Sequence, residues 1–334
     1  MNAALEGNST FIEWGIFFLR KKRGKVCASQ LRSLNCYLKQ SYSFFGDLPI
    51  NKVTIDDIDN MLDSLTSYNP NTKKPASHQY LIDVRNTAAC VFDLAVENDK
   101  ITKNPARKRE ISKYAPKEER RALTLTEQKL VLWTPHRARI AALIMMLAGL
   151  RKGEIIPLEW DDINLDGLYI SITKSVEENS RCYYTVKKGT KNGKWGRNVS
   201  ITIDLAIEIE EAKKHAISKY VCCQLDGSMH SPSSWQNMWE NYMNTICKIN
   251  PIAINTGIRE VTAHFLRHTY ATLLYISGVD VLTASKLLGH ADIRTTLAIY
   301  THLEEMMVIK SVDKLDVYIS KTIFDNQPVF PIVS

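Results

Sequence analysis

The sequence lacks the features of secreted, disulfide-stabilised and zinc-ribbon proteins. Its seven cysteines are an odd number, and no two of them have C-x-x-C spacing. Buried thiols in a reducing cytoplasm therefore account for them better than a disulfide framework or a zinc site. The first residues are polar, and the short apolar stretch Trp14–Leu19 runs directly into a basic cluster. We therefore expect no secretory signal.

Long apolar runs and phosphate-binding loops are missing as well. The most apolar stretch, Ile140–Leu150, is too short to span a bilayer, so no membrane partner is expected. The sequence has no Gly-x-Ser-x-Gly elbow and no glycine-rich loop that would cradle phosphates, so ATP use is not indicated. These absences predict a soluble, cytoplasmic protein.

The overall composition is typical of a globular protein, with a modest positive net charge. The 334 residues are 45% hydrophobic and 24% charged, which is enough for a sizeable core, and the length favours two domains. The formal net charge of +7 permits binding to a polyanion without requiring it.

Four helices are predicted in the first hundred residues. Apolar side chains recur at helical spacing from Phe11, from about 31 to 38, and from about 77 to 98. Thr54 followed by Asp57 is typical of a capped helix start with acids in its first turn. This pattern predicts a helical domain over residues 1–104.

A polar, basic segment over residues 105–121 is the expected linker, because Pro105 and Pro116 break helices and little in it could pack. The second domain is predicted over 122–305, opening on a cap-like start at Thr124 and an apolar helix from 137 to 150.

Strand-like runs then replace the helical pattern. Three short runs rich in β-branched and aromatic residues begin at Leu168, Cys182 and Arg197, with turn residues between them. They predict a small three-stranded antiparallel sheet. Helical periodicity then resumes to about residue 322. The expected fold is mainly α with a small antiparallel sheet.

A cluster of chemically active side chains lies near the C-terminus. His264 and Arg267 stand three residues apart and so share a helix face, and His290 and Tyr300 follow. Phosphodiester cleavage without a metal needs cations on the two non-bridging oxygens, and the planar, permanently charged fork of arginine suits this task. Arg151, which directly follows an apolar helix and a glycine, could supply a second fork. Each residue alone would have an ordinary explanation, such as a surface arginine, a salt-bridged helical arginine or a core tyrosine.

Taken together, these motifs resemble the tyrosine recombinase family, which includes phage and transposon integrases. The matching pieces occur in order over about residues 10–305: Ala-Gly-Leu-Arg151-x-x-Glu154, Thr-Lys191 ahead of Arg-Asn-Val-Ser-Ile, His264-x-x-Arg267-His-Thr, Leu-Gly-His290, and Tyr300 ten residues later. The resemblance implies a C-shaped clamp around duplex DNA, made of a helical core-binding domain and a catalytic domain.

The resemblance also implies a role for each motif residue. Tyr300 would be the nucleophile that forms a 3′-phosphotyrosine, His264 its proton acceptor, and His290 a hydrogen-bond donor to a phosphate oxygen. Lys191, in a turn with three other lysines nearby, would protonate the departing 5′ oxygen. Glu154 is expected to orient a catalytic cation or histidine; the alternative is a simple pairing within its helix.

A metal or other cofactor is not expected. His264 and His268 have the i, i+4 spacing of a zinc pair, but no glutamate lies between them, and Arg267 would repel a cation. The phosphotyrosyl bond retains the energy of the cleaved linkage, so a 5′ hydroxyl can re-attack it without ATP.

Two basic runs and a turn lysine are the expected contacts with DNA phosphates, because they fall at a helix end, at the domain junction and in the hairpin. They are Arg20, Lys21, Lys22, Arg23, Arg107, Lys108, Arg109 and Lys194.

The resemblance implies a specific core recombination site on duplex DNA as the partner. It implies a homotetramer on DNA, a monomer or weak oligomer when free, accessory DNA-bending or directionality factors, and association with the nucleoid when bound. The tail 306–334 would be exchanged between subunits. Some members of this family carry an extra N-terminal arm-site domain, whereas this chain begins almost at the first clamp helix, so the resemblance implies either a simpler system or a chain that lacks such a domain. A type IB topoisomerase and a non-catalytic DNA-binding regulator remain as alternatives.

Overall fold

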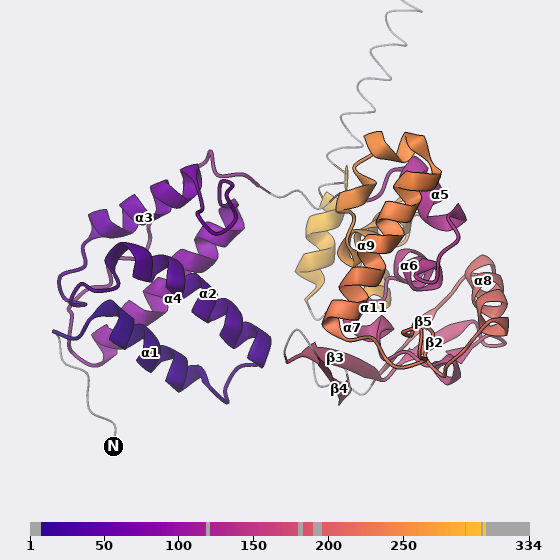
Figure 1. The fold of residues 1–334 in the computed structure, drawn as a ribbon, viewed down its shortest axis with the longest axis horizontal. Helices are drawn as coiled ribbons and strands as arrows, with labels where there is room; N and C mark the ends of the chain where they lie inside the picture. The colour runs from indigo at the N-terminus through magenta and orange to yellow at the C-terminus, as the bar shows by residue number, and fades with distance from the viewer. Residues whose placement is uncertain are drawn as a thin grey trace, which may run out of the picture. The chain divides into compact units, whose positions relative to one another are not determined.

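The computed structural model describes residues 8–117, 121–179, 183–189, 196–290, 292–301 and 303–304. The chain divides into two compact units (Figure 1): residues 1–119 together with 178–180, and residues 120–177 together with 181–334. Each unit has its own buried apolar core. Among the described helices, none is both long enough and apolar enough to cross a membrane.

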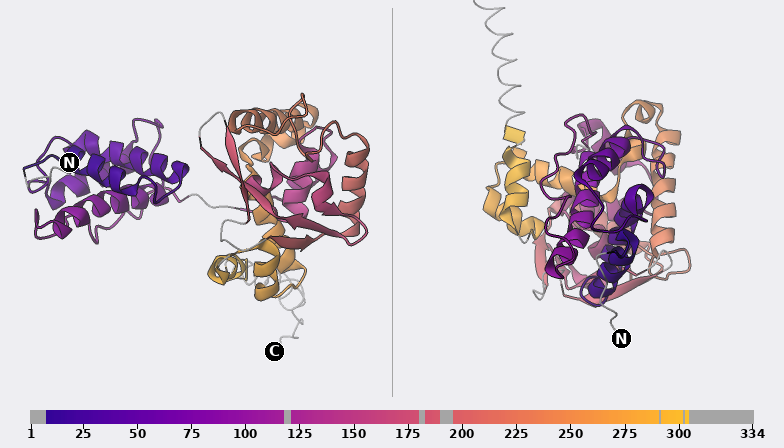
Figure 2. Two further views of the ribbon diagram at one scale, coloured as in Figure 1. Left: turned by 90° about the horizontal axis from the view of Figure 1, so that it is seen from below. Right: turned by 90° about the vertical axis from the view of Figure 1, so that its left-hand side faces the viewer.

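The first unit contains the four helices predicted from its sequence, which pack together in both views of Figure 2. Helix α4 contacts each of the other three. The Thr54 cap is confirmed, since its side chain accepts from the Asp57 backbone and the Asp57 side chain reaches back. The helices are α1 (Phe11–Lys22), α2 (Ala28–Phe45), α3 (Ile55–Ser67) and α4 (His78–Glu97).

Most of the predicted linker belongs to this first unit instead. Ala106 and Ala115 are buried in its core, at 0% and 3% exposure. The Asn104 amide donates to the Ala89 carbonyl and to Asp93, which fixes the segment against α4. Two alanines and a hydrogen-bonded turn give no periodic apolar signal, so the sequence pattern could not reveal this packing.

The second unit is built around α6, whose residues from Ile140 to Met146 are all buried. Helix α6 packs against α5, α8 and α10, which explains why it is apolar on every side. The helices of this unit are α5 (Leu125–Trp133), α6 (Arg139–Leu147), α7 (Lys152–Ile155), α8 (Ile203–Lys214), α9 (Pro232–Ile249), α10 (Ala263–Ile276) and α11 (Val281–Leu288), and residues 293–301 are also helical. Short 3₁₀ turns occupy Trp160–Asp162, Pro251–Asn255 and Ile258–Glu260.

Within the part of the chain that the structure describes, the strands form two small sheets, whereas the sequence predicts one. β2 (Tyr169–Ile172) pairs antiparallel with β1 (Ile163–Asn164) and with β5 (Arg197–Ser200). The second predicted run, which begins at Cys182, contains β4 (Tyr184–Lys188), and β4 pairs with β3 (Lys174–Glu178) instead. β3 reads Lys-Ser-Val-Glu-Glu, which is too charged to be recognised as a strand from its sequence.

Candidate active site

A sharp turn after α6 presents Arg151. Gly149 adopts a left-handed conformation with φ 68°, and a Cβ at this position would meet Tyr270 Cδ1 at 2.3 Å, so only glycine fits here. Arg151 then becomes the residue that precedes α7, and its side chain remains 39% exposed. The first predicted guanidinium therefore leaves a rigid core at a defined place and keeps its charge accessible.

Glu154 links two arginines. Its carboxylate accepts from Arg151 N at 2.9 Å and Arg151 Nη1 at 3.0 Å. It also accepts both arms of Arg197, at 2.8 Å and 3.0 Å. Burial raises the pKa of Glu154, but the hydrogen bonds and positive charge of Arg197 and Arg151 outweigh it and lower the pKa overall. Glu154 therefore pairs with Arg151, three residues before it, and also with Arg197 on a distant strand.

Arg267 is buried at 4% exposure and is held by backbone carbonyls. One arm of its guanidinium donates to the Gly149 carbonyl and the other to the Leu288 carbonyl. Burial lowers its pKa to about 9, with repulsion from Arg151 as the next cause. The side chain is therefore still charged at neutral pH, and it ties the α6 turn to the end of α11.

His290 lies close to these charges. Burial, together with the positive charges of Arg267, Arg151 and Arg197, lowers its pKa to about 4. The ring is therefore neutral at pH 7. Its Nδ1 lies 2.8 Å from the hydroxyl of the buried Thr296. If this hydroxyl donates to Nδ1, the tautomer carries its proton on Nε2, where it can donate to an anion.

A pocket of about 470 Å³ opens beside these residues. Arg151, His264 and Arg267 line it, so the structure brings together three of the predicted residues at one cavity. Helix α9, which the sequence motifs did not implicate, supplies three further lining residues. The remaining lining residues are Lys152, Gly153, Trp235, Gln236, Trp239, Thr262 and Ala263.

Tyr300 occupies a different environment. Its hydroxyl donates to the Val279 carbonyl at 3.1 Å, and its ring packs edge-on against Tyr275 with 5.0 Å between centroids. Burial raises the pKa of Tyr300, and the charge of Asp280 raises it further. Tyr300 is not among the described residues that line the pocket, so this arrangement does not present the predicted nucleophile to the cations.

The remaining predicted residues fall into three groups. Lys191 and Lys194 lie outside the described residues. The basic run Arg20–Arg23 ends α1, where it is mostly exposed and where cations favour the helix C-terminus. In the third group, Arg107 makes a two-armed pair with Asp93 and Arg109 contacts Asp59 at 3.3 Å, whereas the side chain of Lys108 is exposed. The two internal pairs reduce the charge that these arginines can offer to DNA.

Arg197 is the residue that sequence reasoning missed. It begins β5 opposite Ile172, and its side chain is only 15% exposed. The sequence pattern predicts only that Arg197 begins a strand, because nothing in the local pattern shows that its partner is Glu154, more than forty positions away. A search for basic residues that could satisfy a buried Glu154 would have been the only signal available.

Among the described residues, no group of three or more histidine, cysteine, aspartate or glutamate side chains comes together as a metal site. The chemistry that the site offers is the binding of an oxyanion: two guanidinium groups and a histidine at one cavity, and a neutral imidazole close by.

The chain is similar to tyrosine recombinases and integrases in both sequence and fold. It is 26% identical to the tyrosine recombinase XerC-like protein of Caldanaerobacter subterraneus subsp. tengcongensis over 75% of this chain and 68% of that protein. It is 24% identical to the ICEBs1 integrase of Bacillus subtilis over 72% of this chain and 66% of that protein. It is 31% identical to transposase A from transposon Tn554 of Staphylococcus aureus over 57% of this chain and 50% of that protein. The chain thus spans between half and about two thirds of the length of these curated relatives.

Solved structures show the same fold. The Tn1549 transposon integrase in complex with a circular intermediate DNA has a TM-score of 0.74 at 17% identity, covering 87% of this chain and 95% of that one. A lambda integrase dimer bound to a COC′ core site has a TM-score of 0.65 at 18% identity, with coverages of 87% and 95%. Residues 115–307 match the phage integrase family, which is more than half of the chain. The chain therefore belongs to the phage integrase family of tyrosine recombinases.

Proposed function

We propose that this protein is a site-specific DNA recombinase that cleaves and rejoins duplex DNA through a 3′-phosphotyrosyl intermediate, without metal or ATP. The observation that carries the proposal is the pocket lined by Arg151, His264 and Arg267 in a chain of this family. Two guanidinium groups supply the positive charge that a phosphodiester needs when its phosphorus is attacked.

The reaction follows from these groups. The Tyr300 oxygen attacks the phosphorus and forms a P–O bond, while the bond from phosphorus to the 5′ oxygen breaks. His264 accepts the phenol proton, and Lys191 gives a proton to the departing 5′ oxygen. Arg151 and Arg267 neutralise the non-bridging oxygens, and neutral His290 donates from Nε2. A 5′ hydroxyl from another strand then attacks the phosphotyrosine and reverses each step.

Two steps must precede cleavage in this scheme. The Tyr300 hydroxyl must leave the Val279 carbonyl, and the helix at residues 293–301 must carry it to the pocket. Breaking one neutral hydrogen bond of this kind costs about 1 kcal/mol net. The elevated pKa of Tyr300 keeps it protonated in the resting arrangement, so the phenol is protected until it meets a base and the two arginines.

Duplex DNA is the proposed partner, and a homotetramer the proposed assembly for strand exchange. Support comes from relatives: the Tn1549 integrase is solved with DNA, and a lambda integrase tetramer is solved on a Holliday junction, with a TM-score of 0.63 at 19% identity and coverages of 86% and 79%. Integration or excision of a mobile element is the proposed outcome, in line with the integrase and transposase relatives.

A suicide substrate that carries the ends of the host element tests the proposal. The wild-type protein should form a covalent adduct with the DNA 3′ phosphate, and Tyr300→Phe should form none while still binding DNA. Tyr275→Phe is the matched control, because Tyr275 packs against Tyr300 and should keep adduct formation. An adduct with Tyr300→Phe would reject this nucleophile. Relaxation of supercoiled DNA without any element end would instead favour topoisomerase activity.

A further inference from the structure

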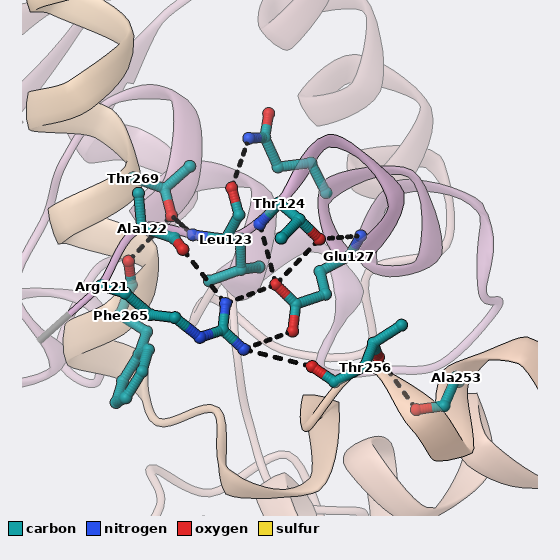
Figure 3. A network of polar contacts seen from close by, with 10 residues as sticks. Arg121, Ala122, Leu123, Thr124, Glu127, Ala253, Thr256, Phe265 and Thr269 are labelled. Atoms are coloured by element: carbon teal, nitrogen blue, oxygen red, sulfur yellow. Dashed lines mark hydrogen bonds and ion pairs between the residues drawn. The ribbon is translucent and has the colours of Figure 1, made fainter. Parts of the chain in front are cut away.

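The start of the second unit is tied by side chains to the helix that carries His264 and Arg267 (Figure 3). Glu127, in the first turn of α5, is fully buried, and both arms of Arg121 reach its carboxylate at 2.6 Å. A buried carboxylate is tolerated only when it is fully paired, so this contact is a structural requirement for the segment.

Thr124 completes the pairing of Glu127. The Thr124 backbone donates to Glu127 Oε2 at 2.8 Å, and the Thr124 hydroxyl accepts from the Glu127 backbone at 3.3 Å. Burial raises the pKa of Glu127, but the hydrogen bonds from Arg121 and Thr124 outweigh it and lower the pKa overall. The carboxylate therefore remains charged and holds Arg121 in one orientation.

Arg121 extends this anchor to the chain that leads into α10. Its Nη2 also donates to the Thr256 carbonyl at 3.2 Å. Thr256 is followed by Gly257, whose φ of 73° allows the sharp turn into the 3₁₀ helix before α10. A Cβ on Gly257 would lie 3.5 Å from Arg121 Nη2, so the guanidinium lies directly against this turn.

A second tie reaches the body of α10. The Leu123 backbone donates to the Thr269 hydroxyl at 2.9 Å, and this hydroxyl donates in turn to the Phe265 carbonyl at 2.9 Å. Thr269 is fully buried, so water cannot replace either bond. Phe265 lies next to His264, and Thr269 lies two residues after Arg267.

We propose that residues 121–127 are a positioning element for α10. In it, Glu127 holds Arg121 and the Leu123 backbone bonds to Thr269 of α10, and together these contacts fix the helix that presents His264 and Arg267 to the pocket. The segment makes two contacts. One is with Thr256, in the chain that leads into α10, and the other is with Thr269, within α10 itself. Sliding or rotation of α10 would break one of these contacts. This inference rests on the proposed function for its effect on catalysis, but the contact itself can be measured without DNA.

Thr269→Val is the sharpest test, because it keeps the shape of the side chain and removes only the hydroxyl. Thr272→Val is the matched control on the same helix: the Thr272 hydroxyl donates to the His268 carbonyl at 3.1 Å, within α10 itself. Thr269→Ser restores the hydroxyl. Displacement of catalytic groups by about 1 Å slows reactions on the order of 100-fold. We expect Thr269→Val to slow adduct formation at saturating DNA by about 10- to 100-fold, while the DNA concentration that gives half of the maximal rate stays unchanged. Thr269→Ser should restore the wild-type rate.

Hydrogen exchange of the free protein provides the readout that does not depend on DNA. Thr269→Val should speed exchange of the Leu123 amide and of α10 amides, while α8 amides of the same unit keep wild-type rates. A uniform increase over α8 and α10 would indicate a general loss of stability and would overturn a positioning role. Equal adduct rates for Thr269→Val and Thr272→Val would overturn it as well.

Arg121→Lys provides a second variant should Thr269→Val fail to fold. Lysine keeps the charge for Glu127 but cannot make the two-armed contact together with the bond to Thr256. The expected result is the same local increase in exchange, centred on residues 256–269. Absence of that increase would reject the anchor. Absence of any adduct with the wild-type protein would instead reject the proposed function. Hydrogen exchange of the free protein would then still test whether residues 121–127 hold α10 in place.

Discussion

Glu154 and Arg197 form a two-armed ion pair, with nitrogen–oxygen distances of 2.8 Å and 3.0 Å, and the same carboxylate holds Arg151. Arg197 is mostly buried, whereas Arg151 keeps more than a third of its side chain exposed. Of the two cations on Glu154, one is therefore structural and the other remains available to a ligand. This division gives Glu154 and Arg197 the role of positioning Arg151.

Arg197→Ala should destabilise the protein and slow cleavage. It would leave a buried carboxylate with only one charged partner, and breaking a buried pair costs about 3 kcal/mol or more. Glu154 would then draw Arg151 inward, so adduct formation on the suicide substrate should fall more than DNA affinity does. Urea denaturation measures the first effect and single-turnover cleavage the second.

Arg139→Ala is the control for Arg197→Ala. It breaks the pair between Arg139 and Glu208, which has a similar nitrogen–oxygen distance of 2.8 Å but about a quarter of each side chain exposed. Neither residue lines the pocket of Arg151. The control should cost less stability and leave cleavage unchanged. Equal cleavage by the two variants would remove Arg197 from the positioning of Arg151.

Gly289→Ala should lower the stability of the protein and slow cleavage, because Gly289 contacts both Arg151 and Arg197. Gly289 has φ 62°, its carbonyl accepts from Arg151 Nη2 at 2.8 Å, and an added Cβ would meet Arg197 Nε at 2.6 Å. The left-handed backbone costs a non-glycine residue about 1 kcal/mol, and the clash with Arg197 adds to this cost.

Gly278→Ala separates these two contributions to the loss. Gly278 has φ 77° and nothing within 4 Å of an added Cβ, so this variant carries only the backbone cost. Thermal unfolding and single-turnover cleavage of both variants should show a larger loss of stability for Gly289→Ala, and a loss of cleavage for that variant alone. Identical behaviour would mean that Arg197 moves aside freely.

Local chemistry made much of the site predictable from the sequence. A threonine cap, an apolar helix followed by glycine, and a histidine three residues before an arginine are each determined by neighbours in the chain. For this reason the start of α3, the exposure of Arg151 and the shared helix of His264 and Arg267 follow from spacing alone.

Contacts between distant segments could not be predicted in this way. Arg197 begins β5, which pairs with β2, and its side chain meets Glu154 on α7, more than forty residues earlier in the chain. The pairing of β4 with β3 depends on backbone hydrogen bonds, which the charged sequence of β3 does not indicate. The position of Tyr300 is a third case. Its sequence motif indicates a reactive phenol, but its packing against Tyr275 and Val279 depends on how the helix at 293–301 lies on α10 and α11.

Stability should fall as the pH is lowered from about 6.5 to about 4, because His230 and His290 are held neutral in the folded protein. Burial lowers the pKa of both rings to about 4, with the charge of Arg137 also acting on His230. In this window the unfolded chain binds protons that the folded chain does not, so the free energy of unfolding increases with pH and is fully recovered above 6.5.

His230 should dominate this dependence, since it is 1% exposed and stands edge-on against Trp235, whereas the His290 ring is only partly buried. A shift of this size corresponds to on the order of 3 kcal/mol for a fully buried group. Chemical denaturation at about pH 7.5 and about pH 5 should show a smaller difference for His230→Gln than for wild type, with His290→Gln in between. An unchanged difference in His230→Gln would place the pH dependence elsewhere. A steeper loss at low pH in that variant would mean that the folded protein binds the His230 proton more tightly than the unfolded chain does.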